Sequence, residues 1–429
     1  MLLQFRFSNY KSFKDENVFD MRAGDGDEYI GHIRKAGTYD VLPVATIYGA
    51  NASGKSNFIL ALSDMAFYVL VSFAFDDQFS LGGVDSEWKK FTSRYPFKPY
   101  LFQHDKPSSY EVYLNQKNGK KEEYLRYGFS VDKKGVVEEW LGTLSEEDAQ
   151  KGKPFHMIFE RNREELHFDK STEKFRENIK NSLQKKVLLI TLGIKLQIRA
   201  FSDVFLWFTR LTSIHADSAL EDSSLNDLFG KVYKKEISKE AVLHYIQSFD
   251  ISVCDIRVKK ILKLSAEPIY HMYIGHQNNH GDLDYLPVEQ ESAGTRKMIS
   301  LYQRLQSTLS KGSVLWADEL DIKIHPLLMR NIIINFTDPE RNPYNAQLIF
   351  TTHNPVYLDM GLLRRDEIWF IQKDDTNSEL YSLDDIRDAY GNKVSTTSDL
   401  AKKYLLGEYG AVPYLNELME KPDYEEFKK

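Results

Sequence analysis

The residues from Gly49 to Ser56 read Gly-Ala-Asn-Ala-Ser-Gly-Lys-Ser and match the pattern G-x-x-x-x-G-K-[ST]. In such a turn, successive backbone N–H groups converge on phosphate oxygens. The start of the following helix adds the positive end of its dipole. Lys55 is expected to reach the β- and γ-phosphates, and the Ser56 hydroxyl to bind Mg²⁺. The pattern therefore predicts a site for a nucleoside triphosphate.

The sequence around this turn supports the prediction. Residues 44–48 are apolar and predict a short buried strand, and residues 57–62 predict the beginning of a helix. Strand, loop and helix are the context that the motif requires. The alternative is a glycine-containing turn that binds nothing, and it is disfavoured because both glycines, the Gly-Lys-Ser run and the strand occur together.

A second apolar run, residues 314–317, ends in Asp318 and Glu319. At the end of a parallel strand beside the loop, Asp318 would hold Mg²⁺, usually through water. Glu319 would lie where a water molecule approaches the γ-phosphate and would act as general base. A further strand, residues 346–350, precedes His353, whose side chain can hydrogen-bond a γ-phosphate or its attacking water. Each of these features alone is more often structural, and their order along the chain favours a functional role.

Upstream of the two carboxylates, residues 291–297 read Glu-Ser-Ala-Gly-Thr-Arg-Lys and precede a helical pattern over residues 298–309. A serine and a glycine at the start of a helix form an anion site. The sequence thus contains, in order, a phosphate loop, a Ser-Gly helix start, an Asp-Glu strand and a strand that ends in histidine.

Length and composition limit the class of protein. The chain has 429 residues, enough for two or three domains, and a net charge of -7, so it has no overall basic surface for nucleic acid. Its one cysteine, Cys254, excludes a disulfide framework and suits a reducing cytoplasm. We place the most apolar window at residues 187–194, which is shorter than the roughly 20 residues of a membrane-spanning helix. We therefore expect no membrane span.

The order of these motifs resembles the ATP-binding cassette (ABC) class of ATPases, and more closely its branch of SMC- and RecF-like proteins. In that class ATP is held between two heads, and the resemblance implies that Ser292, Gly294 and Thr295 of one head cap the γ-phosphate bound by the other. It also implies that Leu320-Asp321 is the D-loop. Ala293 stands where transporters have a second glycine, which weakens a transporter interpretation.

The chain is still more similar to the abortive-infection, RloA- and OLD-like ATPases of bacteria and archaea. The likeness rests on four segments near both ends of the chain: Asn9–Phe13, Glu291–Arg296, Arg364–Phe370 and Tyr404–Pro413. Residues 150–250 match no pattern that we can name. OLD nucleases carry a nuclease domain after the ATPase, and few residues follow His353 here, so we expect no nuclease in this chain.

The resemblance implies an α/β fold: an ABC-type ATPase head with a mixed sheet, a P-loop core, an antiparallel β-subdomain and a helical insertion. Periodicity gives the boundaries. Alternating patterns dominate residues 1–149, which form an N-terminal ATPase lobe with the phosphate loop and an antiparallel meander. Helical spacing dominates the insertion at 150–250, and residues 251–429 form a C-terminal lobe with the signature, the Asp-Glu strand and the switch histidine.

We expect ATP and Mg²⁺ as cofactors. Glu319 and His353 are the predicted catalytic residues, and Ser56 and Asp318 the predicted metal ligands. Lys11 lies in a turn that runs beside the nucleotide in this class, so it joins the nucleotide-binding set. That predicted set is Lys11, Gly49, Asn51, Ala52, Ser53, Gly54, Lys55, Ser56, Asn57, Ser292, Gly294 and Thr295.

The leading functional hypothesis is a cytoplasmic ATPase that acts as sensor or regulator in antiphage defence and controls a separate effector, a nuclease or toxin. It would form a homodimer or higher oligomer through composite ATP sites. The alternative is a RecF-like DNA-binding ATPase of DNA repair, whose lysines would contact phosphates: Lys231, Lys234, Lys235, Lys239, Lys259, Lys260 and Lys263. Neighbouring Glu236 and Glu240 favour an ordinary solvated surface. A third hypothesis, an interaction module with a structural ATP site, is disfavoured by Glu319.

Overall fold

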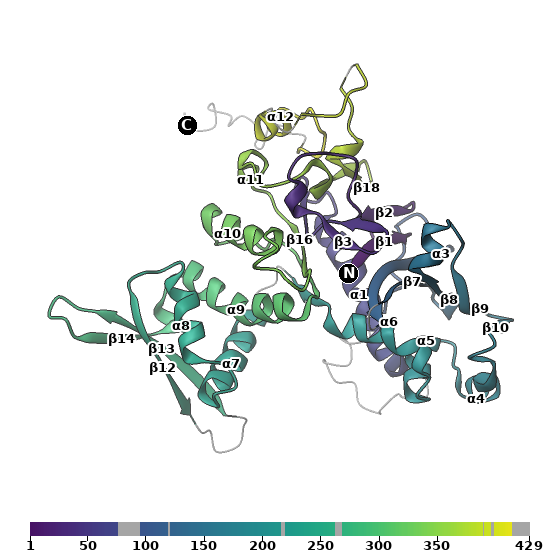
Figure 1. The fold of residues 1–429 in the computed structure, drawn as a ribbon, viewed down its shortest axis with the longest axis horizontal. Coiled ribbons are helices and arrows are strands. Elements are labelled where there is room, and N and C mark those ends of the chain that lie inside the picture. Colours follow the sequence, from purple (N-terminus) through teal and green to yellow (C-terminus); the bar gives the residue numbers. More distant parts are fainter. Residues whose placement is uncertain are drawn as a thin grey trace, which may run out of the picture.

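The computed structural model describes residues 1–75, 95–118, 121–215, 219–261, 268–388, 390–395 and 399–413. Buried side chains within these residues form three hydrophobic clusters. Figure 1 shows a larger body and a smaller lobe that projects from it. The lobe is built around three strands, β12 (Val253–Ile261), β13 (Ile269–Gln277) and β14 (Leu283–Pro287).

A six-stranded sheet carries the predicted phosphate loop. Its strand order is β11-β15-β16-β5-β17-β18. In this order the strands span Thr212–Ile214, Val314–Ala317, Gln347–Thr351, Val44–Tyr48, Ile368–Asp374 and Asn377–Ser382. The first five run parallel, and β17 and β18 form an antiparallel hairpin. Because parallel strands end at one edge of a sheet, the residues after β5, β15 and β16 lie along the same edge.

Helices cover both faces of this sheet. Helix α1 (Lys55–Val71) lies on one face with Ile47, whereas α9 (Ala293–Lys311) and α10 (Pro326–Thr337) lie on the other face with Tyr48. Successive residues of a strand point to opposite faces. Strands covered on both faces are apolar throughout rather than alternating, which explains the continuous apolar runs in the sequence.

A seven-stranded antiparallel sheet packs against the same helix α1. Its strand order is β10-β9-β8-β7-β6-β1-β2. In this order the strands span Leu166–Phe168, His156–Asn162, Gly135–Ser145, Lys121–Asp132, Ser108–Asn118, Leu2–Ser8 and Asn17–Asp20. Gln347 joins the two sheets, because its side chain accepts a hydrogen bond from Leu2 N at 2.6 Å and donates one to Leu2 O at 2.9 Å. The predicted α/β class, with a P-loop sheet and an antiparallel subdomain, is confirmed.

The structure divides residues 150–250, which we predicted to be one helical insertion, between different parts of the molecule. Strands β9 and β10 extend the antiparallel sheet beyond residue 149, and β11 joins the six-stranded sheet. The helices α4, α5 and α6 span Arg176–Ser182, Leu189–Lys195 and Arg199–Arg210, and they pack in the cluster that contains α1. By contrast, α7 (Ala219–Tyr233) and α8 (Lys239–Gln247) pack against β12 and β13 of the lobe.

Helix α9 connects the lobe to the six-stranded sheet. Met298 and Leu301 belong to the cluster of the six-stranded sheet, whereas Ile299 and Tyr302, on another face of the helix, belong to the cluster of the lobe. The helix ends at Lys311, and the next residue, Gly312, has a φ of 59°, in the left-handed region that favours glycine. The remaining α-helices and strands of the described chain are β3 (Arg34–Ala36), β4 (Tyr39–Val41), α3 (Glu146–Gln150), α11 (Val356–Asp359) and α12 (Leu400–Leu405).

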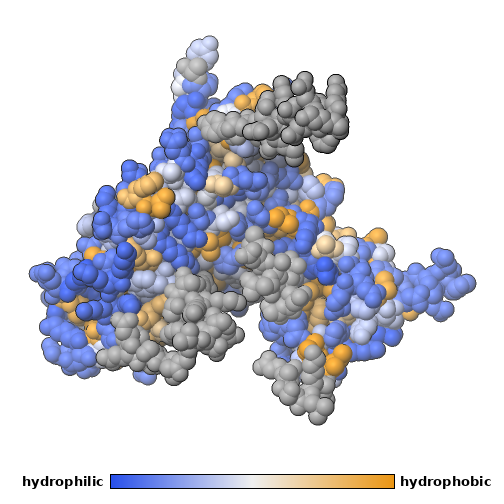
Figure 2. Space-filling view, turned by 180° about the vertical axis from the view of Figure 1, so that it is seen from behind, coloured by the Kyte–Doolittle hydropathy of each residue, from blue (hydrophilic) through white to orange (hydrophobic). Residues whose placement is uncertain are grey.

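By length and composition, one helical stretch among the described residues is apolar enough to cross a membrane. It spans Lys55–Phe75, with a mean hydropathy of 2.0, and 67% of its apolar window is buried inside the protein. It consists of α1 and its short extension, and at 21 residues it is longer than the apolar run at 187–194. On the face seen in Figure 2, hydrophilic residues predominate and hydrophobic residues form separate small patches.

Candidate functional site

The predicted phosphate loop connects the end of β5 to the first residue of α1. Gly54 precedes the helix with a φ of 117°. A Cβ atom at this position would lie 2.6 Å from Ser378 Oγ and 2.9 Å from Ser12 Oγ. Only glycine combines that backbone conformation with such close neighbours. Ala52, inside the loop, also has a positive φ of 62°.

Two segments that are distant in sequence hold the loop in place. The Ser378 hydroxyl, on β18, donates a hydrogen bond to Ser53 O at 2.5 Å, and Ser378 N donates to Ser12 O at 2.8 Å. The Asn57 amide, in the first turn of α1, donates to Ser12 Oγ at 2.9 Å. Within the described residues, the buried Ser53 hydroxyl has no hydrogen-bond partner. A buried hydroxyl without a partner in a loop of this kind fits a polar ligand.

The Lys55 side chain is buried, with 5% of its surface exposed. Its ammonium donates hydrogen bonds to Gly49 O at 2.9 Å and Ala50 O at 3.0 Å, so it lies over the loop. Burial lowers the pKa of Lys55 to about 8, although the negative charges of Glu319 and Asp318 raise it. Both predicted carboxylates are therefore close enough to Lys55 to interact with its charge.

The Thr351 hydroxyl connects the two carboxylate residues. Thr351 is the last residue of β16 and is fully buried. Its hydroxyl donates a hydrogen bond to Asp318 Oδ1 at 2.7 Å and accepts one from Glu319 N at 2.7 Å. A hydroxyl has one hydrogen and two lone pairs, so it can make both bonds at once. Thr351 is not among the predicted site residues, and its place two residues before His353 was the available signal.

Glu319 adopts an unusual backbone conformation, with a φ of 48°. Positive φ is uncommon for residues other than glycine and often occurs at functional sites. Its carboxylate oxygen Oε1 lies 3.4 Å from His353 Nε2. Burial lowers the pKa of His353, Lys55 lowers it further, and Glu319 raises it. The predicted residues Lys55, Asp318, Glu319 and His353 therefore interact with one another in a single site.

The order of strands differs from the simple expectation that the Asp-Glu strand lies beside the loop strand. Strand β16 lies between β15 and β5. Neighbouring strands are about 4.8 Å apart, so Asp318 and the loop are separated by roughly two such spacings. A gap of this size suits contact with a metal ion through water rather than direct ligation.

Asp321 of the predicted D-loop is held within the same chain. Its carboxylate accepts hydrogen bonds from the Thr352 hydroxyl at 2.7 Å and the Tyr357 hydroxyl at 3.3 Å. Burial and the charge of Asp321 raise the pKa of Tyr357. Asp321 thus fixes the chain on both sides of His353.

The predicted signature lies at the start of α9. The Ser292 hydroxyl accepts a hydrogen bond from Thr295 N at 3.0 Å and lies 2.9 Å from the Thr295 hydroxyl, which is the geometry of a helix N-cap. Ser292 is exposed. A Cβ atom at Gly294 would lie 2.9 Å from Lys323 O, so this position requires a small residue. The signature therefore packs on the segment that follows Asp321.

Lys11 lies in the turn that contacts the loop through Ser12. It has a φ of 49°, and its ammonium lies 5.8 Å from the centre of the Tyr10 ring. Burial lowers the pKa of Lys11, the positive charge of Lys98 lowers it further, and Asp64 raises it. Lys98 and Asp64 form an ion pair beside it.

Two of the lysines that would contact DNA under the alternative hypothesis form ion pairs with carboxylates. Lys231 pairs with Asp227 at 2.7 Å, and Lys239 pairs with Asp255 at 2.7 Å. Lys263 lies outside the described residues. Within the described chain, no group of three or more His, Cys, Asp or Glu side chains could hold a metal ion.

The fold and the arrangement of motifs define an ATPase head of the ABC and SMC type. The sequence matches a family model described as "AAA domain, putative AbiEii toxin, Type IV TA system" over residues 44–151 and 145–359. These matches cover more than half of the chain, and the protein belongs to this family. This match confirms the predicted likeness to AAA-type ATPases of the abortive-infection kind. No curated protein matches the sequence.

Several solved structures are distantly similar. An SMC head bound to the C-winged helix domain of ScpA has 13% identity, covers 89% of this chain and 97% of its own, and has a TM-score of 0.40. The SMC head domain from Thermotoga maritima has 12% identity, covers 89% of this chain and 98% of its own, and has a TM-score of 0.35. The Smc head domain with a coiled coil and joint from Pyrococcus yayanosii has 10% identity, covers 95% of this chain and 99% of its own, and has a TM-score of 0.41.

The variant Thr351→Val tests the role of the bridging hydroxyl, because valine keeps the shape of threonine. We expect the free energy of unfolding to fall by about 1–3 kcal/mol, since buried Asp318 loses a donor and Glu319 N loses an acceptor. Thr209→Val is a matched control that removes an exposed hydroxyl bonded to Leu206 O. It should change the free energy by less than about 0.5 kcal/mol. Urea denaturation measures both, and equal losses would contradict a special role for Thr351.

Proposed function

We propose that the protein binds ATP with Mg²⁺ and hydrolyses it to ADP and phosphate. The observation that carries the proposal is the meeting of Lys55, Asp318, Glu319 and His353 at the edge where three parallel strands end. Phosphoryl transfer to water requires groups that bind the phosphates, hold the metal ion and activate the water. Here these are the phosphate loop, the buried carboxylate held by Thr351, and a second carboxylate beside a histidine.

Each residue has a proposed role. The loop residues Gly49, Asn51, Ala52, Ser53, Gly54 and Asn57 would surround the phosphates, and Lys55 would balance the β- and γ-phosphate charge. Ser56 and Asp318 would hold Mg²⁺, which supplies further positive charge to the phosphate oxygens when bound. Lys11 would approach the phosphates from the neighbouring turn.

Glu319 is the proposed general base. It would accept the proton of the attacking water, and its geometry would depend on Thr351, which holds its backbone N–H. The lowered pKa of His353 favours the neutral imidazole. A neutral ring with a proton on Nε2 can donate a hydrogen bond to Glu319 or to a phosphate oxygen while leaving the carboxylate charged.

Two variants separate binding from hydrolysis. Lys55→Ala should abolish ATP binding, because the β- and γ-phosphate charge loses its main partner. Glu319→Gln should bind ATP but hydrolyse it at least about 100-fold more slowly, since only the base is removed. Equilibrium binding of radiolabelled ATP and phosphate release measure the two properties. Hydrolysis by Glu319→Gln at the wild-type rate would show that the role assigned to Glu319 is wrong.

We further propose that the active unit is a head-to-head dimer with two composite sites. Ser292, Gly294 and Thr295 would cap the γ-phosphate bound by the partner subunit. The exposure of Ser292 at the start of a 19-residue helix supports this part of the proposal. The N-terminus of a helix favours anions through its dipole and its free N–H groups.

Mixing two inactive variants tests the composite sites. In a dimer of one Lys55→Ala chain and one Ser292→Arg chain, both defects fall on one site and the other site is intact. After random exchange about half of the dimers are mixed, so roughly a quarter of the wild-type ATPase rate should return.

If the mixture stays inactive although mixed dimers form, either the sites work only in pairs or the composite arrangement is wrong. A structure of the Glu319→Gln protein with ATP distinguishes these two explanations. A direct hydrogen bond requires about 3 Å, so a closed dimer in which Ser292 lies more than about 10 Å from every γ-phosphate contradicts the arrangement.

At the level of the cell, we propose a cytoplasmic sensor or regulator in antiphage defence that controls a separate nuclease or toxin. The description of its family, which includes a putative toxin of a toxin–antitoxin system, supports this context. Mass spectrometry of the complex purified from its native cells tests the proposal. We expect a second protein that stays bound or dissociates according to the ATP state. A chain that copurifies only with itself in every nucleotide state contradicts a stable effector complex.

A further inference from the structure

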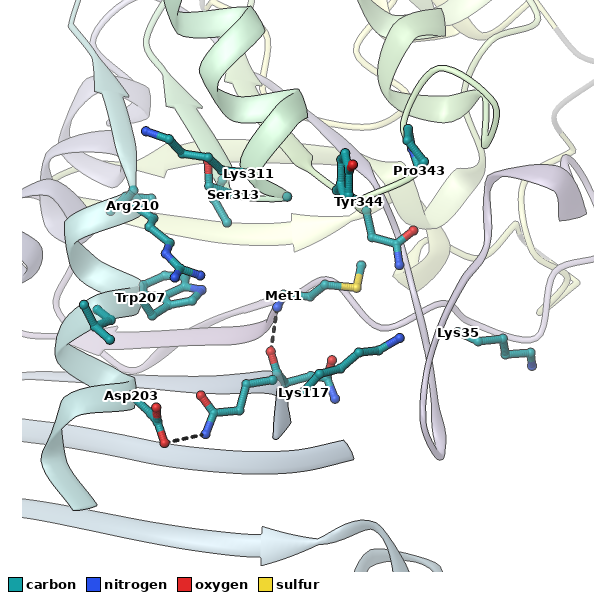
Figure 3. Close-up of a pocket in the computed structure, with 17 residues that line it drawn as sticks. Met1, Lys35, Lys117, Asp203, Trp207, Arg210, Lys311, Ser313, Pro343 and Tyr344 are labelled. Atoms are coloured by element: carbon teal, nitrogen blue, oxygen red, sulfur yellow. Dashed lines mark hydrogen bonds between the residues drawn. The ribbon is translucent and has the colours of Figure 1, made fainter. Parts of the chain in front are cut away.

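A pocket of about 460 Å³ lies at the opposite end of the six-stranded sheet from the phosphate loop. Figure 3 shows that Trp207 and Arg210 project into it from α6, Lys311 and Ser313 lie on a second side, and Tyr344 lies on a third. Ser313 immediately precedes β15, whereas Asp318 follows that strand at its other end. The pocket is thus separate from the proposed ATP site.

The charge in the pocket is mainly positive. Arg210 and Lys311 are both exposed, and no carboxylate of the described chain forms an ion pair with either side chain. Two further lysines at the rim have partners, because Lys35 pairs with Asp40 at 2.5 Å and Lys117 lies 3.4 Å from Glu122.

The carboxylate that lines the pocket does not neutralise the two free cations. Asp203 accepts a hydrogen bond from the Gln116 amide at 3.1 Å. Figure 3 shows this bond below Trp207, on the side of the pocket away from Lys311. The positive charge of Arg210 and Lys311 is therefore available to an anion, although the protein as a whole has a net charge of -7.

The pocket also offers flat apolar surfaces and amide groups. Trp207 is half-buried, so its ring is held by the protein while part of it lines the pocket, and Tyr344 is 64% exposed. Aromatic rings stack on nucleobases regardless of their identity. Gln116 and Asn345 also line the pocket. The Asn345 amide can donate to and accept from the edge of a base, whereas Gln116, whose amide nitrogen donates to Glu123 and Asp203, can only accept.

We propose that this pocket binds a nucleoside phosphate, with its base against Trp207 or Tyr344 and its phosphate at Arg210 and Lys311. Pockets for small ligands measure about 300–1,000 Å³, so the volume suits one such molecule. Guanidinium groups bind phosphate through paired hydrogen bonds, and ammonium groups bind it as point charges. An inorganic anion would leave the aromatic rings without a role, and an extended nucleic-acid strand would not fit within this volume.

Binding is measured in a Lys55→Ala background, so that the phosphate loop does not contribute. The probes are AMP, GMP, CMP and UMP, with inorganic phosphate and a 5′-phosphorylated single-stranded oligonucleotide for comparison, each by isothermal titration calorimetry. We expect at least one mononucleotide to bind with a Kd below about 1 mM, and more tightly than phosphate. Arg210→Glu with Lys311→Glu should weaken it at least about tenfold.

A control variant with the same change in net charge has its two substitutions outside the pocket. Lys133→Glu with Lys170→Glu replaces two exposed lysines outside the pocket and should change the Kd by less than about twofold. At least one of the variants Trp207→Leu and Tyr344→Leu should weaken mononucleotide binding, and neither should change phosphate binding. Because Arg210 and Lys311 are exposed, their variants should keep the thermal midpoint of the parent protein, which circular dichroism verifies.

Four results would overturn the proposal. They are no binding of any mononucleotide, equal binding by the Arg210→Glu/Lys311→Glu variant, phosphate binding as tight as that of the best nucleotide, and binding of the oligonucleotide alone. Since Lys55 is absent from every protein compared, failure here leaves the proposed ATPase site untouched. Failure of the ATPase variants likewise leaves this pocket untouched.

Discussion

The burial of helix α1 between two sheets is the constraint on which the rest of the structure depends. Phe58 of this helix contacts Phe7 of the antiparallel sheet and Trp316 of the parallel sheet, with ring centres 6.1 Å and 4.8 Å apart. The Trp316 indole also donates a hydrogen bond to Ile59 O at 2.8 Å. Because the helix is packed from both sides, its first residue, Lys55, is held at a defined place relative to the strand that carries Asp318. The packing of α1 in the core therefore fixes the position of the predicted phosphate loop.

The second constraint acts at the edge of the parallel sheet. Asp318 is buried and Glu319 has a strained backbone, and either feature alone would cost stability. The Thr351 hydroxyl offsets both costs with two hydrogen bonds, and it can do so because β16 is the immediate neighbour of β15. The strand order is thus a requirement of the site.

Much of this site could be predicted from the sequence because its key features are local. The spacing of Gly49, Gly54 and Lys55 defines the loop without reference to any other segment, and Asp318 and Glu319 directly follow an apolar run. The contacts that support them were not predictable, since Ser378 is 325 residues from Ser53 and no pattern connects the two. The same limit applies to residues 150–250, where a helical period is visible but does not reveal which cluster each helix joins.

The apolar composition of α1 has a physical origin too. A helix that is covered on all sides needs no polar face, so its sequence resembles a membrane span. Only the packing of α1 against two sheets distinguishes the cases, and this packing involves strands from both ends of the chain.

Lys55 shows how the fold holds a functional group at the expense of stability. Burial lowers its pKa from 10.5 to about 8, which means that the folded protein holds the proton less tightly than the unfolded chain does. The cost of the buried charge is fully present below pH 8 and is relieved as the pH rises toward 10.5. At neutral pH the ammonium is retained by two loop carbonyls and by the charges of Asp318 and Glu319. A phosphate group is a partner that would compensate this cost, and a perturbed pKa of this kind is typical of functional sites.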